Sequence, residues 1–327
     1  MNRIHSLDYL KTIFAVLVVF AHTNWMQRHL SPPVFVLGNG LMRMLVPLFC
    51  VIAGYFLYRA IERGKTGRWL MRVLCLYLFW MAVYIPYWQG QMTSARAFAI
   101  TMLWGFSHLW FLSGLLVAGL AVAGCNALGA RLMPGHPLAL MIAAAVLCAL
   151  IGLGLEYLDL SGLRHVPTQR FRNGLFMCFP FVTLGYVLSL RAERGDAPPA
   201  RRRLVLIAAL GLGLLCLEAW LVQAWRGTGV MIEVPISTYL AVPAVFLLVL
   251  QLDLPPQPVD LGLISATIYF LHIWAFQLAE WVGLDRVWAL MIWGVGVPTL
   301  VALVYDALIR RRARGRRGAE VRPHAAR

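Results

Sequence analysis

The chain has 327 residues, of which 61% are hydrophobic and 13% are charged, and its formal net charge is +15. A soluble domain carries roughly twice that share of charged residues, so the composition excludes an ordinary soluble protein and predicts a polytopic membrane protein. An excess of basic residues is also found in nucleic-acid-binding proteins, but its placement along this chain argues against that class.

Apolar runs separated by polar connections follow one another along the whole chain. A bilayer core of ~30 Å needs about 20 helical residues, and runs near that length lie at 7–26, 37–57, 70–88, 108–128, 137–155, 174–190, 204–225, 235–252, 261–281 and 287–309. We therefore expect an all-α integral membrane protein with about ten transmembrane helices. A single domain would cover residues 1–309, followed by a basic tail over 310–327.

Basic residues are distributed unevenly between the two sides of these runs. Ten spans put both termini on one side, which holds 21 of the 29 lysines and arginines, against seven on the other side and Arg43 inside a span. Because cytoplasmic connections of membrane proteins are rich in these residues, we expect both termini in the cytoplasm and the 156–172 connection outside. The basic tail is then a topology anchor that contacts anionic lipid, not nucleic acid.

The first run, Leu7 to Met26, carries three ionisable side chains. Lys11 and His22 are eleven residues apart, close to three helical turns, so they share one face about 16 Å apart, and Asp8 lies within about 40° of that face. Ionisable groups in a membrane helix mark a functional path by default. The alternatives are that Asp8 and Lys11 sit at the interface, where lysine snorkels, and that His22 is a hydrogen-bonded core residue.

The predicted topology places the remaining polar residues at two depths. The cytoplasmic group consists of Asp8, Lys11, Arg68 and Arg72, and the opposite group consists of His22, Arg43, His108, Arg170 and Arg172. Basic side chains at the cytoplasmic mouth suit a phosphate-bearing ligand, although Arg68 alone would also fit a topology anchor. A histidine beside an arginine suits proton transfer and stabilisation of an oxyanion.

The six cysteines all lie in apolar runs without CxxC spacing, so we expect neither a metal site nor a disulfide framework.

Several segments resemble the acyltransferase-3 family of membrane proteins. SLDYLKTIFAVLVVFAH at 6–22 is similar to the first helix of the family, with ten residues between its basic residue, Lys11, and its histidine, His22. RMLVPLFCVIAGYF at 43–56, HLWFL at 108–112 and SATIYFLH at 265–272 resemble later segments in the same order. Two positions depart from the pattern. Ala53 replaces the usual serine before Gly54, and the usual Arg-x-x-Arg pair is displaced, because Trp69 lies three residues before Arg72 and the other arginine is Arg68.

The resemblance implies a bacterial inner-membrane enzyme that moves an acyl group from cytoplasmic acyl-coenzyme A to an extracytoplasmic or lipid-linked saccharide. It implies that His22 is catalytic and that the basic cytoplasmic residues contact coenzyme A. We expect O-acetyl transfer, with acetyl-CoA or another acyl-CoA as co-substrate and no permanently bound cofactor. His22 would act as general base or carry the acyl group, Arg43 or His108 would stabilise the oxyanion or orient His22, and Arg170 and Arg172 would face the acceptor. Membrane lipids, and possible further copies of the chain, would be its other partners.

Two other classes remain open from the sequence. A transporter or flippase of a lipid-linked glycan would also have about ten spans and intramembrane charges, but we detect no internal repeat. A non-catalytic receptor has no sequence feature in its favour.

Overall fold

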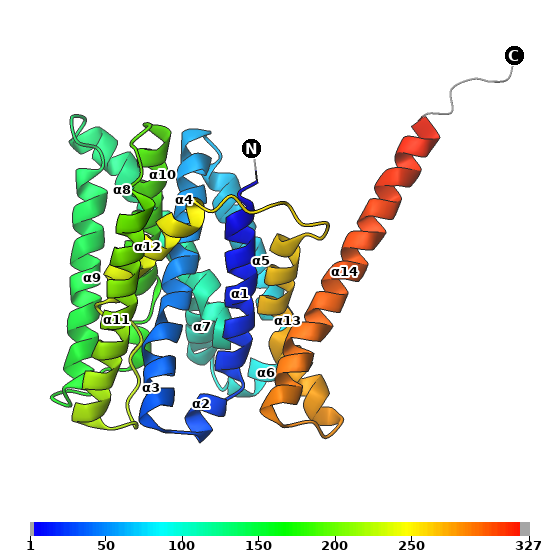
Figure 1. The fold of residues 1–327 in the computed structure, drawn as a ribbon, viewed down its shortest axis with the longest axis horizontal. Helices are drawn as coiled ribbons and strands as arrows, with labels where there is room; N and C mark the ends of the chain where they lie inside the picture. The colour runs from blue at the N-terminus through cyan, green and yellow to red at the C-terminus, as the bar shows by residue number, and fades with distance from the viewer. Residues whose placement is uncertain (1–2, 321–327) are drawn as a thin grey trace, which may run out of the picture. The chain divides into compact units, whose positions relative to one another are not determined.

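The computed structural model describes residues 3–320, where every regular element is a helix and none is a strand. The predicted all-α class is confirmed. The chain forms two compact units (Figure 1): unit 1 combines Met1–His29 with Leu252–Arg327, and unit 2 is Leu30–Gln251. The expected division into one domain over 1–309 and a tail over 310–327 stays a prediction, and residues 321–327 of that tail lie outside the described part.

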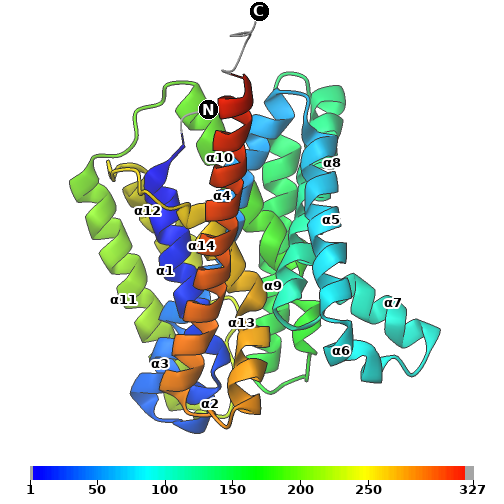
Figure 2. The same cartoon turned by 90° about the vertical axis from the view of Figure 1, so that its right-hand side faces the viewer.

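Unit 1 consists of α1 (His5–His22), the short α2 (Trp25–Arg28), α13 (Leu261–Trp281) and α14 (Val287–Glu320). Helices α1 and α13 run in the same direction and α14 returns, so α1 begins and α14 ends at the same end of the unit (Figure 2). Ala15 and Val19 of α1 pack in one apolar cluster with Ile268 and Phe276 of α13. This packing holds the last turns of α1 against α13.

Helix α1 ends four residues earlier than the apolar run predicts. Asn24 has a φ of 57°, in the left-handed region, which asparagine tolerates better than most residues and which cannot continue a right-handed helix. Thr23 closes the helix with its hydroxyl, which donates to the Phe20 carbonyl at 2.8 Å. His22 is therefore the last residue of α1, at the helix end that carries a partial negative charge.

Unit 2 contains the remaining helices, which are α3 (Pro32–Asn39), η1 (Leu41–Met44), α4 (Leu45–Glu62), α5 (Thr66–Val83), α6 (Ile85–Trp88), η2 (Gln89–Gln91), α7 (Ala95–Trp104), η3 (Ser107–Leu109), α8 (Trp110–Leu132), α9 (Ala139–Leu160), η4 (Thr168–Arg170), η5 (Gly174–Cys178), α10 (Phe179–Glu193), α11 (Arg201–Arg226) and α12 (Thr238–Leu250).

Two glycines set the crossing of α4 and α10. A Cβ atom at Gly54 would lie 1.9 Å from the Val182 carbonyl oxygen, and one at Gly185 would lie 2.0 Å from the Val51 carbonyl oxygen. Such close backbone approach is typical of membrane helix interfaces.

The predicted runs at 37–57 and 174–190 also depart from a regular α-helix. The run at 37–57 breaks at Gly40, so that Arg43 lies in the 3₁₀ turn η1 and not in a continuous span. A Cβ at Gly40 would lie 2.5 Å from the Val36 carbonyl oxygen and 3.0 Å from that of Leu215, so the break occurs where α3 meets α11. The run at 174–190 begins with the π-turn η5, which ends two residues before Pro180, a residue without the backbone N–H of a regular helix.

The polar connection predicted from residue 156 begins later. Helix α9 continues to Leu160, and Glu156 is 1% exposed inside it. The carboxylate ends an otherwise apolar run in the sequence, but buried backbone N–H groups from another segment satisfy it, as described below.

Eight helices within residues 3–320 are long and apolar enough to cross a membrane: His5–Arg28, Pro32–Glu62, Ser107–Leu132, Ala139–Leu160, Gly174–Glu193, Arg201–Arg226, Leu261–Trp281 and Val287–Arg310. The other two predicted runs also form helices, α5 and α12, but α5 carries Arg68 and Arg72 in its first two turns and α12 has 13 residues. Ten spans and cytoplasmic termini stay predictions.

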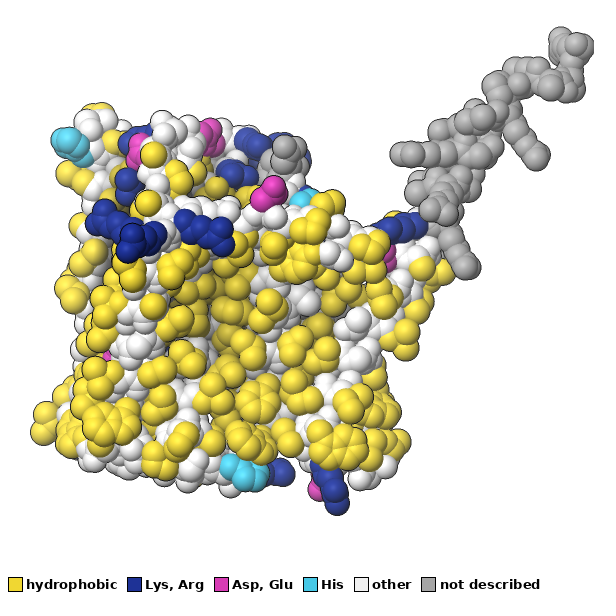
Figure 3. Space-filling view, in the orientation of Figure 1, with side chains coloured by type: hydrophobic (Ala, Val, Ile, Leu, Met, Phe, Trp, Pro, Cys, Tyr) yellow, Lys and Arg dark blue, Asp and Glu magenta, His cyan; other side chains and the backbone are white. Residues whose placement is uncertain are grey.

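The surface and the connections give a way to test the topology. In Figure 3, hydrophobic side chains cover the middle of the visible surface, and Lys and Arg side chains gather toward the helix ends. We expect thiol reagents added outside the membrane to label Leu163→Cys, because Leu163 is 83% exposed in the connection predicted to lie outside. Exposed Ala192 lies on the opposite side in this topology, so Ala192→Cys should be labelled only after permeabilisation. The unsubstituted chain is the background control, and the reverse labelling pattern would invert the topology.

Candidate functional site

His22 contacts a second histidine within unit 1. The rings of His22 and His272, the latter on α13, have centroids 5.0 Å apart and planes inclined by 52°. His22 Nδ1 lies 2.8 Å from the Val18 carbonyl oxygen. Because a carbonyl oxygen only accepts hydrogen bonds, Nδ1 carries the hydrogen and the lone pair of neutral His22 lies on Nε2. His22 is thus held in the tautomer that can take a proton at Nε2.

Four charged residues form a cluster where α1 and α13 begin. The Asp8 carboxylate pairs with Arg3 at 2.5 Å and with Lys11 at 2.7 Å, and Arg3 also pairs with Asp260. Asp260 caps α13 by accepting a hydrogen bond from the Leu263 amide. Burial raises the pKa of Asp260, but the hydrogen bonds from Arg3 and from the Leu263 amide, together with the positive charge of Arg3, hold that pKa below its usual range.

The donor-binding roles of Asp8 and Lys11 stay predictions, but the ion pairs of Asp8 bear on its part in them. A carboxylate repels phosphate, so Asp8 fits a residue that holds Lys11 and Arg3 in place better than a phosphate ligand. Arg3 and Asp260 were not among the predicted site residues. Their only signal in the sequence is their position beside the first and ninth apolar runs.

Arg68 and Arg72 lie on α5 and are both exposed. Residues four apart share a face of a helix, so the displaced pair still presents two guanidinium groups on one side. Trp69 occupies the contact with α8, where its ring would meet a Cβ at Gly119 at 2.6 Å. The spacing found in this chain is therefore compatible with two exposed arginines acting together.

Arg43 and Arg172 share one buried carboxylate. Arg43 Nη1 donates to Glu233 Oε2 at 2.9 Å, and Arg172 Nη1 donates to Glu233 Oε1 at 3.1 Å. The Glu233 side chain is only 4% exposed. This carboxylate explains how the fold accommodates Arg43, and it brings Arg43 together with Arg172.

Other polar groups fix the segment that carries Glu233. The Glu156 carboxylate accepts hydrogen bonds from the amides of Glu233 and Val234. The Asn39 side-chain oxygen Oδ1 accepts from the Ile232 amide at 2.9 Å and from Arg43 Nη2 at 3.2 Å. Sequence reasoning missed Glu156, Glu233 and Asn39. Glu156 could have been found as a carboxylate at the end of an apolar run.

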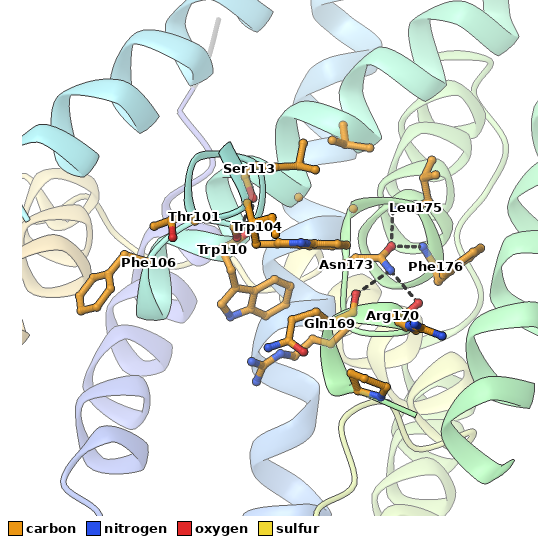
Figure 4. A pocket seen from close by; sticks show the side chains of 18 of the residues that line it. Thr101, Trp104, Phe106, Trp110, Ser113, Gln169, Arg170, Asn173, Leu175 and Phe176 are labelled. Atoms are coloured by element: carbon orange, nitrogen blue, oxygen red, sulfur yellow. Dashed lines mark hydrogen bonds between the residues drawn. The ribbon is translucent and has the colours of Figure 1, made fainter. Parts of the chain in front are cut away.

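A pocket of about 1240 Å³ opens between α7, α8, α9 and the segment from η4 to η5 (Figure 4). Arg170 and Arg172, both predicted on the acceptor side, line it together with the aromatic side chains Trp104, Phe106, Trp110 and Phe176. The Arg172 guanidinium lies over the Trp110 ring, 5.1 Å from its centroid. The pocket thus combines cationic groups with flat aromatic surfaces.

Asn173 shapes the wall that carries the two arginines. Its side-chain oxygen accepts hydrogen bonds from the amides of Leu175 and Phe176, and its side-chain nitrogen donates to the carbonyls of Gln169 and Arg170 (Figure 4). All four bonds lie between 2.9 and 3.1 Å. This residue therefore ties the turn before η5 to η4.

His108 is not among the residues that line the pocket, although its neighbours Ser107 and Trp110 are. It is 3% exposed, and its ring packs edge-on against Tyr84, with centroids 5.2 Å apart. His108 is thus packed in the core, and its proposed catalytic role stays a prediction. The expected common depth of His22, Arg43 and His108 also stays a prediction, because His22 belongs to unit 1 and the other two to unit 2.

A family model described as an acyltransferase domain matches residues 4–307. Comparison with curated proteins and with solved structures found no match. The matched range covers nearly the whole chain and contains all the site residues discussed above except Arg3.

Proposed function

Because this chain belongs to the acyltransferase-3 family and is a membrane acyltransferase, we propose that it acetylates a hydroxyl group of an extracytoplasmic or lipid-linked saccharide with cytoplasmic acetyl-CoA. The observation that carries the proposal is the state of His22. Its Nδ1–H is bound to the Val18 carbonyl, so Nε2 offers a lone pair to an acidic proton. A bacterial inner membrane is the location that fits such a reaction.

The reaction needs one proton acceptor. The hydroxyl oxygen attacks the thioester carbonyl carbon while its proton moves to His22 Nε2. The carbon–sulfur bond then breaks, its electron pair goes to sulfur, and the imidazolium returns the proton to the thiolate. The products are the saccharide ester and free coenzyme A. The position of His22 at the end of α1 stabilises the imidazolium, because the helix carries a partial negative charge there.

Lys11 in unit 1 and Arg72 in unit 2 each carry a positive charge that suits a phosphate group of the donor. Lys11→Ala and Arg72→Ala should each raise the KM for acetyl-CoA about 10–150-fold, because losing a charge-assisted hydrogen bond costs about 1.5–3 kcal/mol. Steady-state kinetics of the purified protein would measure this. Arg131→Ala, which removes an exposed arginine at the end of α8, is the matched control. Donor kinetics unchanged in Lys11→Ala and Arg72→Ala would assign both residues to membrane anchoring.

The pocket in unit 2 suits the acceptor. Sugar rings pack on aromatic faces, and Trp104 and Trp110 provide two of them, while Arg170 provides a charge for a carboxylate or phosphate. The Arg172 charge is already shared with Glu233. Arg170 is therefore the residue with the larger role in recognising an anionic acceptor.

Arg170→Ala should raise the KM for the acceptor at least tenfold and leave the KM for acetyl-CoA within twofold, because it removes one charge-assisted contact. Arg170→Lys should be intermediate, since lysine keeps the charge and loses the planar fork. Arg164→Ala removes an exposed arginine from the same connection outside the pocket and is the control. An acceptor KM equal in both alanine variants would remove Arg170 from the acceptor site.

The experiment that tests the proposal uses the purified full-length protein in lipid nanodiscs. It is given acetyl-CoA labelled on the acetyl group and surface polysaccharide from cells that lack the protein. We expect release of free coenzyme A that depends on polysaccharide, and label in the polysaccharide that mild alkali removes, as it does from an ester. No thiol release and no labelled polysaccharide, with the protein folded, would overturn the proposed donor and acceptor.

A further inference from the structure

The ring beside His22 belongs to a fully buried histidine. His272 is 0% exposed, whereas His22 is only half-buried. His272 therefore cannot meet a substrate from solvent by itself. Anything it contributes to the reaction has to act through a neighbouring side chain.

Two backbone carbonyls and a second ring fix the orientation of the His272 imidazole. Its Nδ1 lies 2.8 Å from the Tyr269 carbonyl oxygen and 3.1 Å from that of Ile268, so Nδ1 carries the hydrogen and shares it between them. Phe276 packs edge-on against the same ring, with centroids 5.7 Å apart. The imidazole is thus held rigidly between Phe276 and His22.

The His22 imidazole is restrained less by its own helix than the His272 imidazole is. The bond from Nδ1 to Val18 sets its tautomer, but His22 is the last residue of α1 and the chain turns immediately after it at Asn24. A side chain at a helix end has fewer neighbours from its own helix than one in the middle. The ring of His272 packs against the His22 imidazole, with centroids 5.0 Å apart, and so limits its rotation.

We propose that His272 is a positioning residue for His22: its fixed ring keeps the His22 imidazole in the orientation in which Nε2 takes the hydroxyl proton. The inference rests on the proposed function, in which His22 is the base. Proton transfer and acyl transfer depend steeply on the placement of the reacting groups, and an error of about 1 Å can cost about 100-fold in rate. The contribution of His272 appears in kcat, because the ring lies too deep to bind either substrate.

Two substitutions separate the ring of His272 from its hydrogen bond. His272→Asn keeps a side-chain donor for the backbone carbonyls and removes the ring, so kcat should fall about tenfold while both KM values stay within twofold. His272→Phe keeps a ring against His22 and should retain kcat within about threefold of the unsubstituted protein. A purely structural role would lower the amount of folded protein and not the kcat per folded molecule, so a fall in kcat at unchanged KM values identifies a positioning role.

Ser265→Ala is the control, because Ser265 is a buried polar residue on the same helix, 6% exposed, whose hydroxyl donates to the Gly262 carbonyl. It should leave kcat unchanged. A folded His272→Asn protein with kcat within twofold of normal would overturn the inference, and so would a His272→Phe protein less active than His272→Asn. If His272→Asn does not fold, a His272→Phe protein with a tenfold loss of kcat would also overturn it. The His22→Gln protein separates failure of this inference from failure of the proposed function. If His22→Gln is active, His22 is not the general base and the proposed function itself fails.

Discussion

Replacing His22 by glutamine should lower the rate of acyl transfer by about 100-fold or more, the loss typical of a missing general base. Glutamine keeps a side-chain donor for the Val18 carbonyl but cannot take a proton. Donor binding should survive, because the cluster of Asp8 and Lys11 lies at the opposite end of α1. The measurement is single-turnover release of coenzyme A from the purified protein, together with the Kd for acetyl-CoA.

His29→Gln is the matched control for this substitution. His29 also places Nδ1 near a backbone carbonyl, 2.9 Å from that of Trp25, but it is exposed and stacks on the Trp25 ring. The His29→Gln protein should transfer acyl groups at the normal rate. Near-normal activity of His22→Gln would make His22 a structural histidine and would remove the base from the proposed reaction.

The positions of the helices could be predicted because apolar length alone determines where a membrane helix lies. The run at 261–281 matches α13 to the residue, and every other predicted run contains a helix. The points at which helices end or are interrupted were harder to predict, because each depends on a single residue. Asn24 ends α1 and Gly40 interrupts the second run, and both residues also occur inside regular helices of other proteins.

The candidate site was predictable only in part, for a related reason. Lys11 and His22 lie on one helix, so helical geometry could connect them. Glu233 contacts Arg172 and Arg43 across 61 and 190 residues of sequence, and helical periodicity has no bearing on such a contact. Likewise, the contact of His272 with His22 depends on the packing of α13 against α1, which no spacing in the sequence describes.

Removal of the Glu233 carboxylate should strongly destabilise unit 2. Glu233→Ala leaves Arg43 and Arg172 without their shared partner, and breaking a buried ion pair costs about 3–5 kcal/mol. The two arginine side chains are 20% and 31% exposed, so water relieves some of that cost and we expect about 3 kcal/mol. This corresponds to a fall of roughly 5–10 °C in the apparent Tm of the solubilised protein. Asp285→Ala, which removes an exposed carboxylate, should leave the Tm unchanged.

A triple substitution separates the stabilising role of this cluster from a role in the reaction. Replacing Arg43 and Arg172 by methionine together with Glu233→Leu removes all three charges, and apolar replacement of a complete buried ionic cluster is often neutral or stabilising. The apparent Tm should therefore return to within a few degrees of normal. If Arg43 stabilises the oxyanion, activity stays low in the triple variant although stability recovers, because the charge is still missing. Recovery of both stability and kcat would show that Arg43 only balances Glu233, and oxyanion stabilisation would then have to come from another group.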